Sequence, residues 1–219
     1  MYNRLILMYT FDMPPKTKID FSDAHQDRSK KTLDDLLEAA YDIVEAADPK
    51  AFNGRYLADQ SGYALGTLTK RLGPIENVFL WAIEKSRDKK LREIVNFIVQ
   101  FDPHSSLLEF AELTVEKCFR NVGITGPIVI RYYENKLLKR DGYSADSFNF
   151  SDIFIEPYLK MVSVNQTNTF RKVPQDELKL MLNMIHKLLE RPFVNKDPIA
   201  GSEEHRRIAV ESIVRLLGK

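Results

Sequence analysis

The chain has 219 residues, of which 44% are hydrophobic and 29% charged, so it is long enough for one large or two modest domains with a buried core. The formal net charge of +1 gives no bulk attraction to nucleic acid, and the single cysteine, Cys118, excludes an internal disulfide and a cysteine-rich zinc site. No apolar run approaches the roughly 18 residues of a membrane span, and the apolar start of the chain lacks the cleavage site of a secretory signal. We therefore expect an intracellular, cytoplasmic protein with no membrane partner.

The first 31 residues show little hydrophobic periodicity and contain two adjacent prolines, Pro14 and Pro15, so we interpret residues 1–31 as a loosely ordered arm. A helical spacing of apolar residues begins after Thr32, which is a suitable N-cap because its side chain can accept a hydrogen bond from the first turn. The pattern predicts a helix over residues 32–47.

Two short helices follow the first one. Residues 54–60 form the earlier of the two, with Asn53 as its N-cap, and residues 65–72 form the later one. Gly62 lies in the turn between them, and Pro74 is well placed at the first position of a long fourth helix.

The rest of the sequence also has helical periodicity, interrupted by polar loops at residues 141–151 and 165–172. The predicted helices in this part cover residues 105–121, 127–140, 152–164, 174–190 and 203–217. No convincing strand pattern interrupts them, so the expected fold class is all-α, with about nine helices. The expected organisation is a three-helix head at residues 32–75, continuous with a larger helical domain at residues 76–219.

Residues 52–79 have the layout of a helix-turn-helix, in which the second short helix enters the major groove of DNA. The outer face of that helix carries threonines and a Lys-Arg pair, which can contact base edges or phosphates. The glycine of the helix lets its backbone approach the duplex. The tyrosine of the turn could reach a phosphate with its hydroxyl. The candidate DNA-binding residues are Lys31, Thr32, Asn53, Tyr63, Gly66, Thr67, Thr69, Lys70 and Arg71. The alternative is an ordinary solvated face, since short helices around a glycine are common in all-α proteins.

Four short motifs narrow the class further: Leu57-Ala58, Ser61-Gly62-Tyr63, Gly66-Thr67-Leu68 and Leu72-Gly73-Pro74. In their order and spacing, residues 32–80 resemble the N-terminal DNA-binding domain of the TetR family of transcriptional regulators. The resemblance implies a homodimer that binds double-stranded DNA, with an all-helical domain behind the head that senses a small-molecule effector.

The sequence departs from the family pattern at four positions. Gly54 stands where the family usually has a buried valine or isoleucine, and Ala64 replaces the usual serine or threonine cap. Thr69 and Ile75 stand where the family usually has a tyrosine and a lysine that contact phosphates. These departures put two phosphate contacts in doubt.

The last two predicted helices have regular apolar stripes, which are the kind of surface through which the resemblance implies that two subunits form a four-helix bundle. The candidate dimer-interface residues are Leu178, Met181, Leu182, Ile185, Ile208, Ile213 and Leu216. The alternative is ordinary packing within one chain.

The region between residues 93 and 193 is rich in aromatic side chains, which could line a pocket for an apolar or aromatic effector. The candidate effector-binding residues are Phe97, Phe101, Phe119, Tyr132 and Tyr158. The alternative is that each of them is plain core.

No pattern in the sequence indicates catalysis, a cofactor or a metal. The four histidines are far apart, and none is spaced from a glutamate or another histidine as in zinc or di-iron sites. The sequence therefore predicts a sequence-specific DNA-binding regulator, and the resemblance to the TetR family implies a repressor that a small apolar or aromatic effector releases. Two alternatives stay open: a TetR-like DNA-binding protein without an effector, and an all-α protein-interaction module whose head has lost DNA binding.

Overall fold

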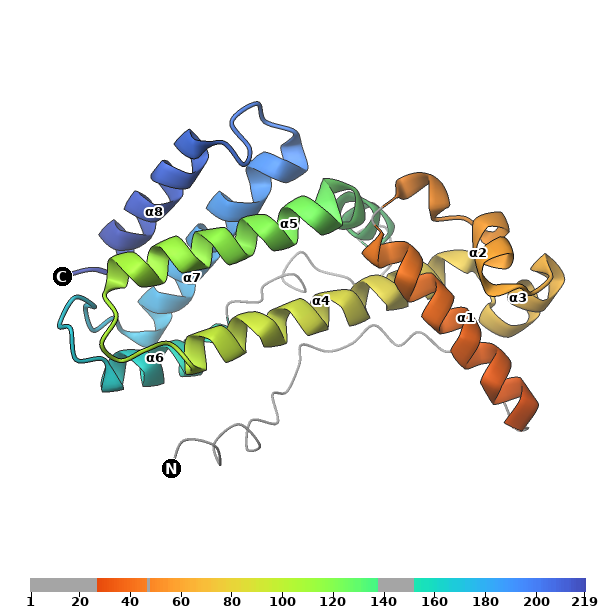
Figure 1. Cartoon of the computed structure of the whole chain (residues 1–219), viewed down its shortest axis with the longest axis horizontal. Helices are drawn as coiled ribbons and strands as arrows, with labels where there is room; N and C mark the ends of the chain where they lie inside the picture. Colours follow the sequence, from red (N-terminus) through yellow and green to blue (C-terminus); the bar gives the residue numbers. More distant parts are fainter. Residues whose placement is uncertain (1–26, 47, 138–151) are drawn as a thin grey trace.

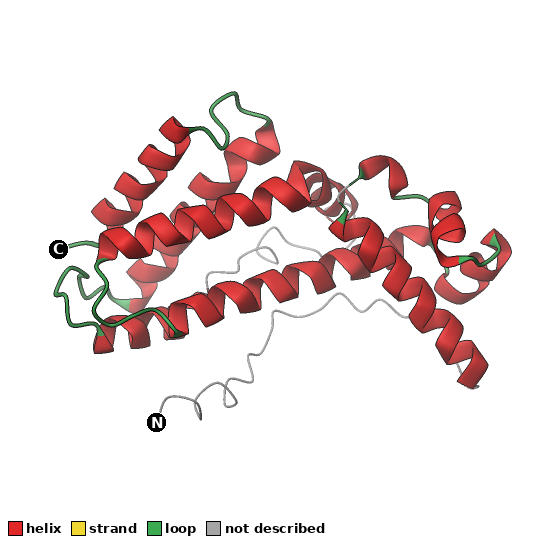
Figure 2. Cartoon of the chain, in the orientation of Figure 1, coloured by secondary structure: helices red, strands yellow, loops and turns green. Residues whose placement is uncertain are grey.

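The computed structural model describes residues 27–46, 48–137 and 152–219, and in these ranges the chain forms a small helical head joined to a larger helical body (Figure 1). Helices and loops make up the described residues, with one isolated antiparallel bridge between Phe170 and Gly218 and no longer strand (Figure 2). The all-α prediction is therefore confirmed. Within the same ranges, no helix is both long and apolar enough to cross a membrane.

The head contains the first α-helix, α1 (Asp27–Glu45), a short 3-10 helix, η2 (Pro49–Ala51), and two short helices, α2 (Gly54–Ser61) and α3 (Leu65–Leu72). Helices α1 and α3 pack on the first half of α4 (Ile75–Val99), and α2 packs on α1 and α3. The buried apolar residues of the head core are Leu36, Ala40, Ile43, Val44, Ala51, Leu57, Leu68, Leu72, Val78, Phe79, Leu80, Ala82, Ile83 and Val129.

The first helix begins earlier than predicted. It starts at Asp27, so Thr32 lies inside α1 and is not its N-cap. Residues 28–31 include good helix formers but no apolar residue. Hydrophobic spacing alone therefore places the start of the helix too late. The rest of the predicted arm, residues 1–26, lies outside the described residues.

Two long antiparallel helices connect the head to the body: α4, which runs from the head, and α5 (Leu107–Leu137), which returns to it (Figure 1). The prediction of two helices at 105–121 and 127–140 was wrong, because α5 is continuous through Gly126 and Pro127. Ser106 and Glu109 form a reciprocal capping box at its start: Ser106 N–H donates to the Glu109 carboxylate at 2.6 Å, and Glu109 N–H donates to the Ser106 hydroxyl at 3.3 Å. The end of the predicted second helix and the predicted loop at 141–151 lie outside the described residues.

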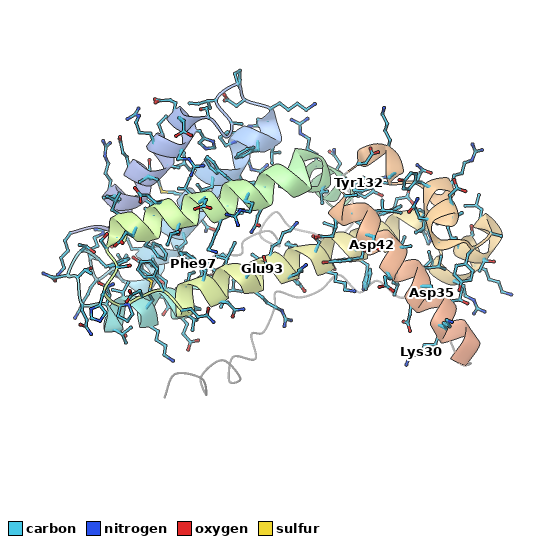
Figure 3. All side chains as sticks on the ribbon, in the orientation of Figure 1. Lys30, Asp35, Asp42, Glu93, Phe97 and Tyr132 are labelled. Carbon is cyan, nitrogen blue, oxygen red and sulfur yellow. The ribbon has the colours of Figure 1, made fainter. Side chains whose placement is uncertain are left out.

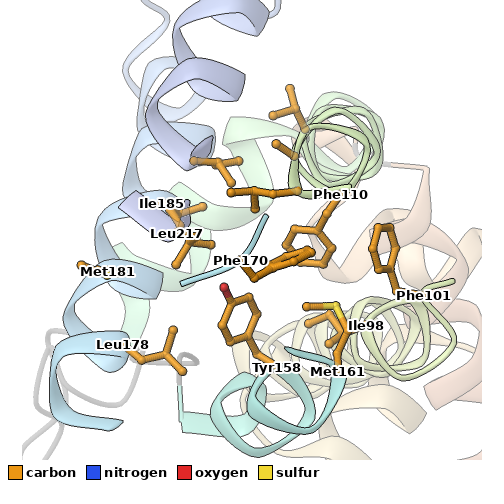
Figure 4. Packing of buried hydrophobic residues seen from close by; sticks show 14 of the residues in the cluster. Ile98, Phe101, Phe110, Tyr158, Met161, Phe170, Leu178, Met181, Ile185 and Leu217 are labelled. Carbon is orange, nitrogen blue, oxygen red and sulfur yellow. The ribbon is translucent and has the colours of Figure 1, made fainter. Parts of the chain in front are cut away.

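The body is completed by α6 (Asp152–Val164), α7 (Gln175–Asn195) and α8 (Glu203–Leu217), of which α7 and α8 both pack on α5. Ser202 caps α8 as predicted, accepting from the His205 N–H at 3.1 Å. Aromatic rings fill the centre of the body core, among them Phe110, Tyr158 and Phe170 (Figure 4).

The two cores share the two long helices. On α4, Phe79 and Ile83 belong to the head core and Ile98 to the body core, whereas on α5, Phe110 belongs to the body core and Val129 to the head core. The head is therefore attached to the body along two helices rather than through one linker.

Candidate nucleic-acid interface

The turn between α2 and α3 is set by hydrogen bonds at both ends of α2. Asn53, as predicted, caps the start of the helix: its side chain accepts from the Tyr56 N–H at 3.0 Å. At the other end Gly62 adopts a left-handed conformation (φ 73°) and its N–H donates to the Ala58 carbonyl. A side chain would strain this conformation, so glycine stops α2 and lets the chain turn into α3 after three residues.

The inner side of the helix pair is apolar and buried. Leu57 of α2 and Leu68 and Leu72 of α3 are at most 1% exposed and pack against α1 and α4. This burial fixes the rotation of α3 about its axis and thereby decides which of its side chains point away from the head.

The outer side of α3 carries part of the predicted DNA-binding set. Gly66, Thr69 and Lys70 are exposed, whereas Thr67 and Arg71 are half-buried. The Thr69 hydroxyl donates to the Leu65 carbonyl at 3.1 Å, within the same helix. Outside α3, Lys31 is exposed near the start of α1 and Thr32 is half-buried; the neighbouring Lys30 marks that outer end of the head in Figure 3.

Tyr63 is held by the head itself. Its hydroxyl donates to the Asp35 carboxylate of α1 at 2.7 Å, and the contact is partly buried. The predicted phosphate contact through this hydroxyl would require that bond to break or to be shared. Sequence patterns could not predict this contact, because the two residues are 28 positions apart.

Two of the departures from the TetR pattern, those at positions 54 and 75, belong to a single packing arrangement. A Cβ on Gly54 would lie 3.0 Å from Leu65 Cδ1 and 3.3 Å from Ile75 Cγ1. Gly54 therefore leaves the space that the Leu65 and Ile75 side chains occupy, and Ile75 is half-buried against the head core. The glycine and the missing lysine at position 75 are explained together.

The candidate effector-binding residues do not gather around one site. Phe97 and Phe101 lie with Phe110, at ring centroid distances of 5.6 and 5.2 Å from it, and Tyr158 joins the same cluster at 6.1 Å. Tyr132 instead contacts Phe52 of the head at 5.2 Å, and Figure 3 shows it far along the molecule from Phe97. Phe119, the fifth candidate, packs against Phe193 and His205 at 5.2 and 4.4 Å. The rings are in contact with one another, as in a packed core.

The body core nevertheless contains polar groups that the described residues do not satisfy. The Tyr158 hydroxyl and the Thr114 hydroxyl are buried and have no hydrogen-bond partner in the part of the chain that the structure describes. Burial also raises the pKa of the Tyr158 phenol. Cys118 is inert by comparison, because burial, with the Glu190 carboxylate nearby, raises the pKa of its thiol to about 12.

Much of the predicted dimer stripe lies inside the chain. Leu178, Met181, Ile185 and Ile213 belong to the body core, and Leu182, Leu216 and Ile208 are only partly exposed. These four core residues pack against other residues of the same chain. The exposed large apolar residues of α7 are instead Leu180 (59%) and Met184 (56%), which do not belong to the core-facing stripe.

No group of histidine, cysteine, aspartate or glutamate side chains in the described residues could hold a metal ion.

The sequence matches no protein-family model and no curated protein sequence.

The fold is similar to that of solved transcriptional regulators. A TetR-family transcriptional regulator from Streptomyces coelicolor superposes with a TM-score of 0.54 at 11% identity, over 85% of this chain and 79% of that one. A TetR transcriptional regulator from Rhodococcus sp. RHA1 superposes with a TM-score of 0.51 at 13% identity, over 85% of this chain and 95% of that one. The chain thus has an all-helical fold with a helix-turn-helix head, and that fold is the one found in TetR-family regulators.

Proposed function

We propose that this protein is a cytoplasmic, sequence-specific DNA-binding regulator that acts as a homodimer, most simply as a repressor that a small apolar or aromatic molecule releases. The observation that carries the proposal is the geometry of the head: α2 and α3 joined by a three-residue turn, with Gly66, Thr69 and Lys70 exposed on the outer side of α3. A helix with a bare backbone, a small hydroxyl side chain and a long cation suits the major groove, where lysine and threonine can contact bases or phosphates.

In a dimer, the two α3 helices must lie about 34 Å apart, one helical turn of DNA, to enter successive major grooves. A molecule that binds better to a form with another separation lowers DNA affinity by shifting the population of the two forms. The continuous connection of head and body through α4 and α5 supports such coupling, because a shift of either helix in the body also moves residues of the head core.

The effector part of the proposal is supported by the buried Tyr158 hydroxyl. A buried hydroxyl without a partner is unfavourable by about 1–3 kcal/mol. A bound molecule with one polar group among apolar and aromatic surroundings would satisfy it.

A second candidate function, a protein-interaction module with a head that no longer binds DNA, is favoured by three observations at the expected phosphate contacts. The Tyr63 hydroxyl is bonded to Asp35, the Thr69 hydroxyl to the Leu65 carbonyl, and Ile75 packs against Gly54. The first two engage hydroxyls that a phosphate contact would use, and at position 75 an apolar side chain stands where the family usually has a lysine.

The test is selection of binding sites from a random or genomic DNA pool, followed by titration of the best site at two or more salt concentrations. We expect the selection to yield a palindromic site that a dimer binds. Lys70→Ala should weaken this binding, and if Lys70 contacts a phosphate the salt slope of the variant should be lower by about one per half-site. Lys172→Ala is the matched control, since Lys172 is also an exposed lysine but lies in the body. Failure to enrich any site, or binding that Lys70→Ala leaves unchanged, would favour the interaction module.

A further inference from the structure

Three consecutive nonpolar residues are exposed where α3 begins. Ala64, Leu65 and Gly66 are all exposed, and Leu65 is 47% exposed. Ala64 is the N-cap residue but makes no side-chain hydrogen bond. The N-terminal residues of a recognition helix are those that contact base edges. The 64–66 segment therefore faces the expected position of the bases. Its side chains neither donate nor accept hydrogen bonds.

None of the residues that the structure describes requires glycine at position 66. Its backbone is helical, and a Cβ built on it would meet no atom within 4 Å. Glycine is a poorer helix former than alanine, so the fold alone would favour a side chain here. A bare backbone at this exposed position suits the close approach of a DNA base, which a side chain would obstruct.

The Leu65 side chain is held in place beside that backbone. Its Cδ1 occupies the space left by Gly54, next to the side chain of Ile75. One part of the leucine is thus buried against the head, and the remaining part is presented to solvent next to Gly66.

We propose that Leu65 and the Gly66 backbone form the contact site for the C5 methyl group of a thymine, so that this protein requires thymine at one position of each DNA half-site. The thymine methyl is the apolar feature of the major groove, and proteins read it by apolar contact. Leu65 supplies the apolar surface, Gly66 supplies the space, and the polar Thr69 and Lys70 lie one turn further along the helix for the neighbouring bases or phosphates. The inference rests on the proposed function, because it assumes that α3 enters the major groove.

The experiment uses the full-length protein and the DNA site obtained by selection. Each thymine of the site is replaced in turn, in both half-sites, by deoxyuridine, which removes only the methyl group, and affinity is measured by fluorescence anisotropy. At one position we expect the wild-type affinity to fall about fourfold for each half-site, on the order of tenfold for the pair. In Leu65→Ala the ratio of thymine to deoxyuridine affinity at that position should fall close to one, whereas Leu65→Met should keep most of it. Leu108→Ala is the matched control, because Leu108 is also an exposed leucine on a helix, 51% exposed, but lies in the body.

Gly66→Ala distinguishes a role of Gly66 in DNA contact from a purely structural role, because stability and DNA affinity should change in opposite directions. It should raise the thermal midpoint, since alanine is the better helix former, and yet weaken binding at least tenfold. The proposal is overturned if the selected site binds tightly but no thymine responds to loss of its methyl group, or if Leu65→Ala preserves the full ratio. Failure to select any site would instead contradict the proposed function itself.

Discussion

At Gly54 an added Cβ would come within 3.0 Å of Leu65 Cδ1 and 3.3 Å of Ile75 Cγ1, so both side chains would have to move slightly. Leu65 and Ile75 both approach the bare Cα, and Ile75 stands where a TetR-type head usually has a lysine. Considered one position at a time, the sequence suggested two separate losses, a buried apolar residue at 54 and a phosphate contact at 75. The structure shows that the two positions belong to one packing arrangement, in which the Leu65 and Ile75 side chains occupy the space that a side chain at position 54 would need. A single sequence cannot reveal this, because the residues meet only after α2, α3 and α4 have packed.

We expect Gly54→Val to destabilise the protein by about 1–3 kcal/mol, because the added methyl groups overfill a packed site. Ile75→Ala should recover part of that loss, so that the two changes are not additive in a double-mutant cycle measured by urea denaturation. Gly66→Ala, placed where a Cβ meets no atom, is the control and should not destabilise. Strictly additive effects of the changes at 54 and 75 would contradict the packing explanation.

The continuity of α5 shows how tertiary contacts override a local signal. Gly126 and Pro127 are typical of a helix end, since proline lacks the N–H that would bond to the carbonyl four residues earlier. The helix continues because its two halves are held independently, the first by the body core and the second by the head core, through Val129 and Tyr132. Sequence periodicity found both halves, but it could not show that they form one helix.

The contact between Tyr132 and Phe52 joins α5 to the head, and Phe52 in turn stacks on Phe79 of α4 at 5.2 Å. We expect Phe52→Ala and Tyr132→Ala to show a coupling energy of about 0.5–1.5 kcal/mol in a double-mutant cycle, as for other aromatic pairs. Pairing Tyr132→Ala with Phe193→Ala, in the body, supplies the control, and those two effects should add to within about 0.5 kcal/mol. Equal coupling in both cycles would mean that the Tyr132 contact is not specific.

At the scale of the whole molecule, hydrophobic spacing identified which side of α7 and α8 is apolar but not which surface covers it. Leu178, Met181, Ile185 and Ile213 are covered by the chain's own body core. The fold class, the head and its buried leucines could be predicted from the sequence because helix periodicity and capping are local. The effector and dimer residues remain predictions, because their roles depend on which helices become neighbours and on what binds there.

A dimer formed through α7 would therefore use the outer residues Leu180 and Met184. We expect the double change Leu180→Glu and Met184→Glu to convert the proposed dimer to a monomer in sedimentation velocity, since charges would be buried at the contact, and to weaken DNA binding with it. Leu113→Glu, at a position 41% exposed on α5, tests whether any exposed leucine has this effect. A wild-type monomer, or a double variant that remains dimeric, would rule out this surface.

Because α4 and α5 each contribute residues to both cores, the places where the chain can gain or lose residues are also restricted. One residue added to or removed from α4 would shift the head by about 1.5 Å along the helix and turn it by about 100°. The other helix holds the same two cores at their present separation, so it would resist that displacement unless its own length changed to match. Insertions and deletions between the cores should therefore be tolerated only as paired changes in the two helices, whereas the connection at residues 100–106 and the loop at 165–172 lie outside this constraint.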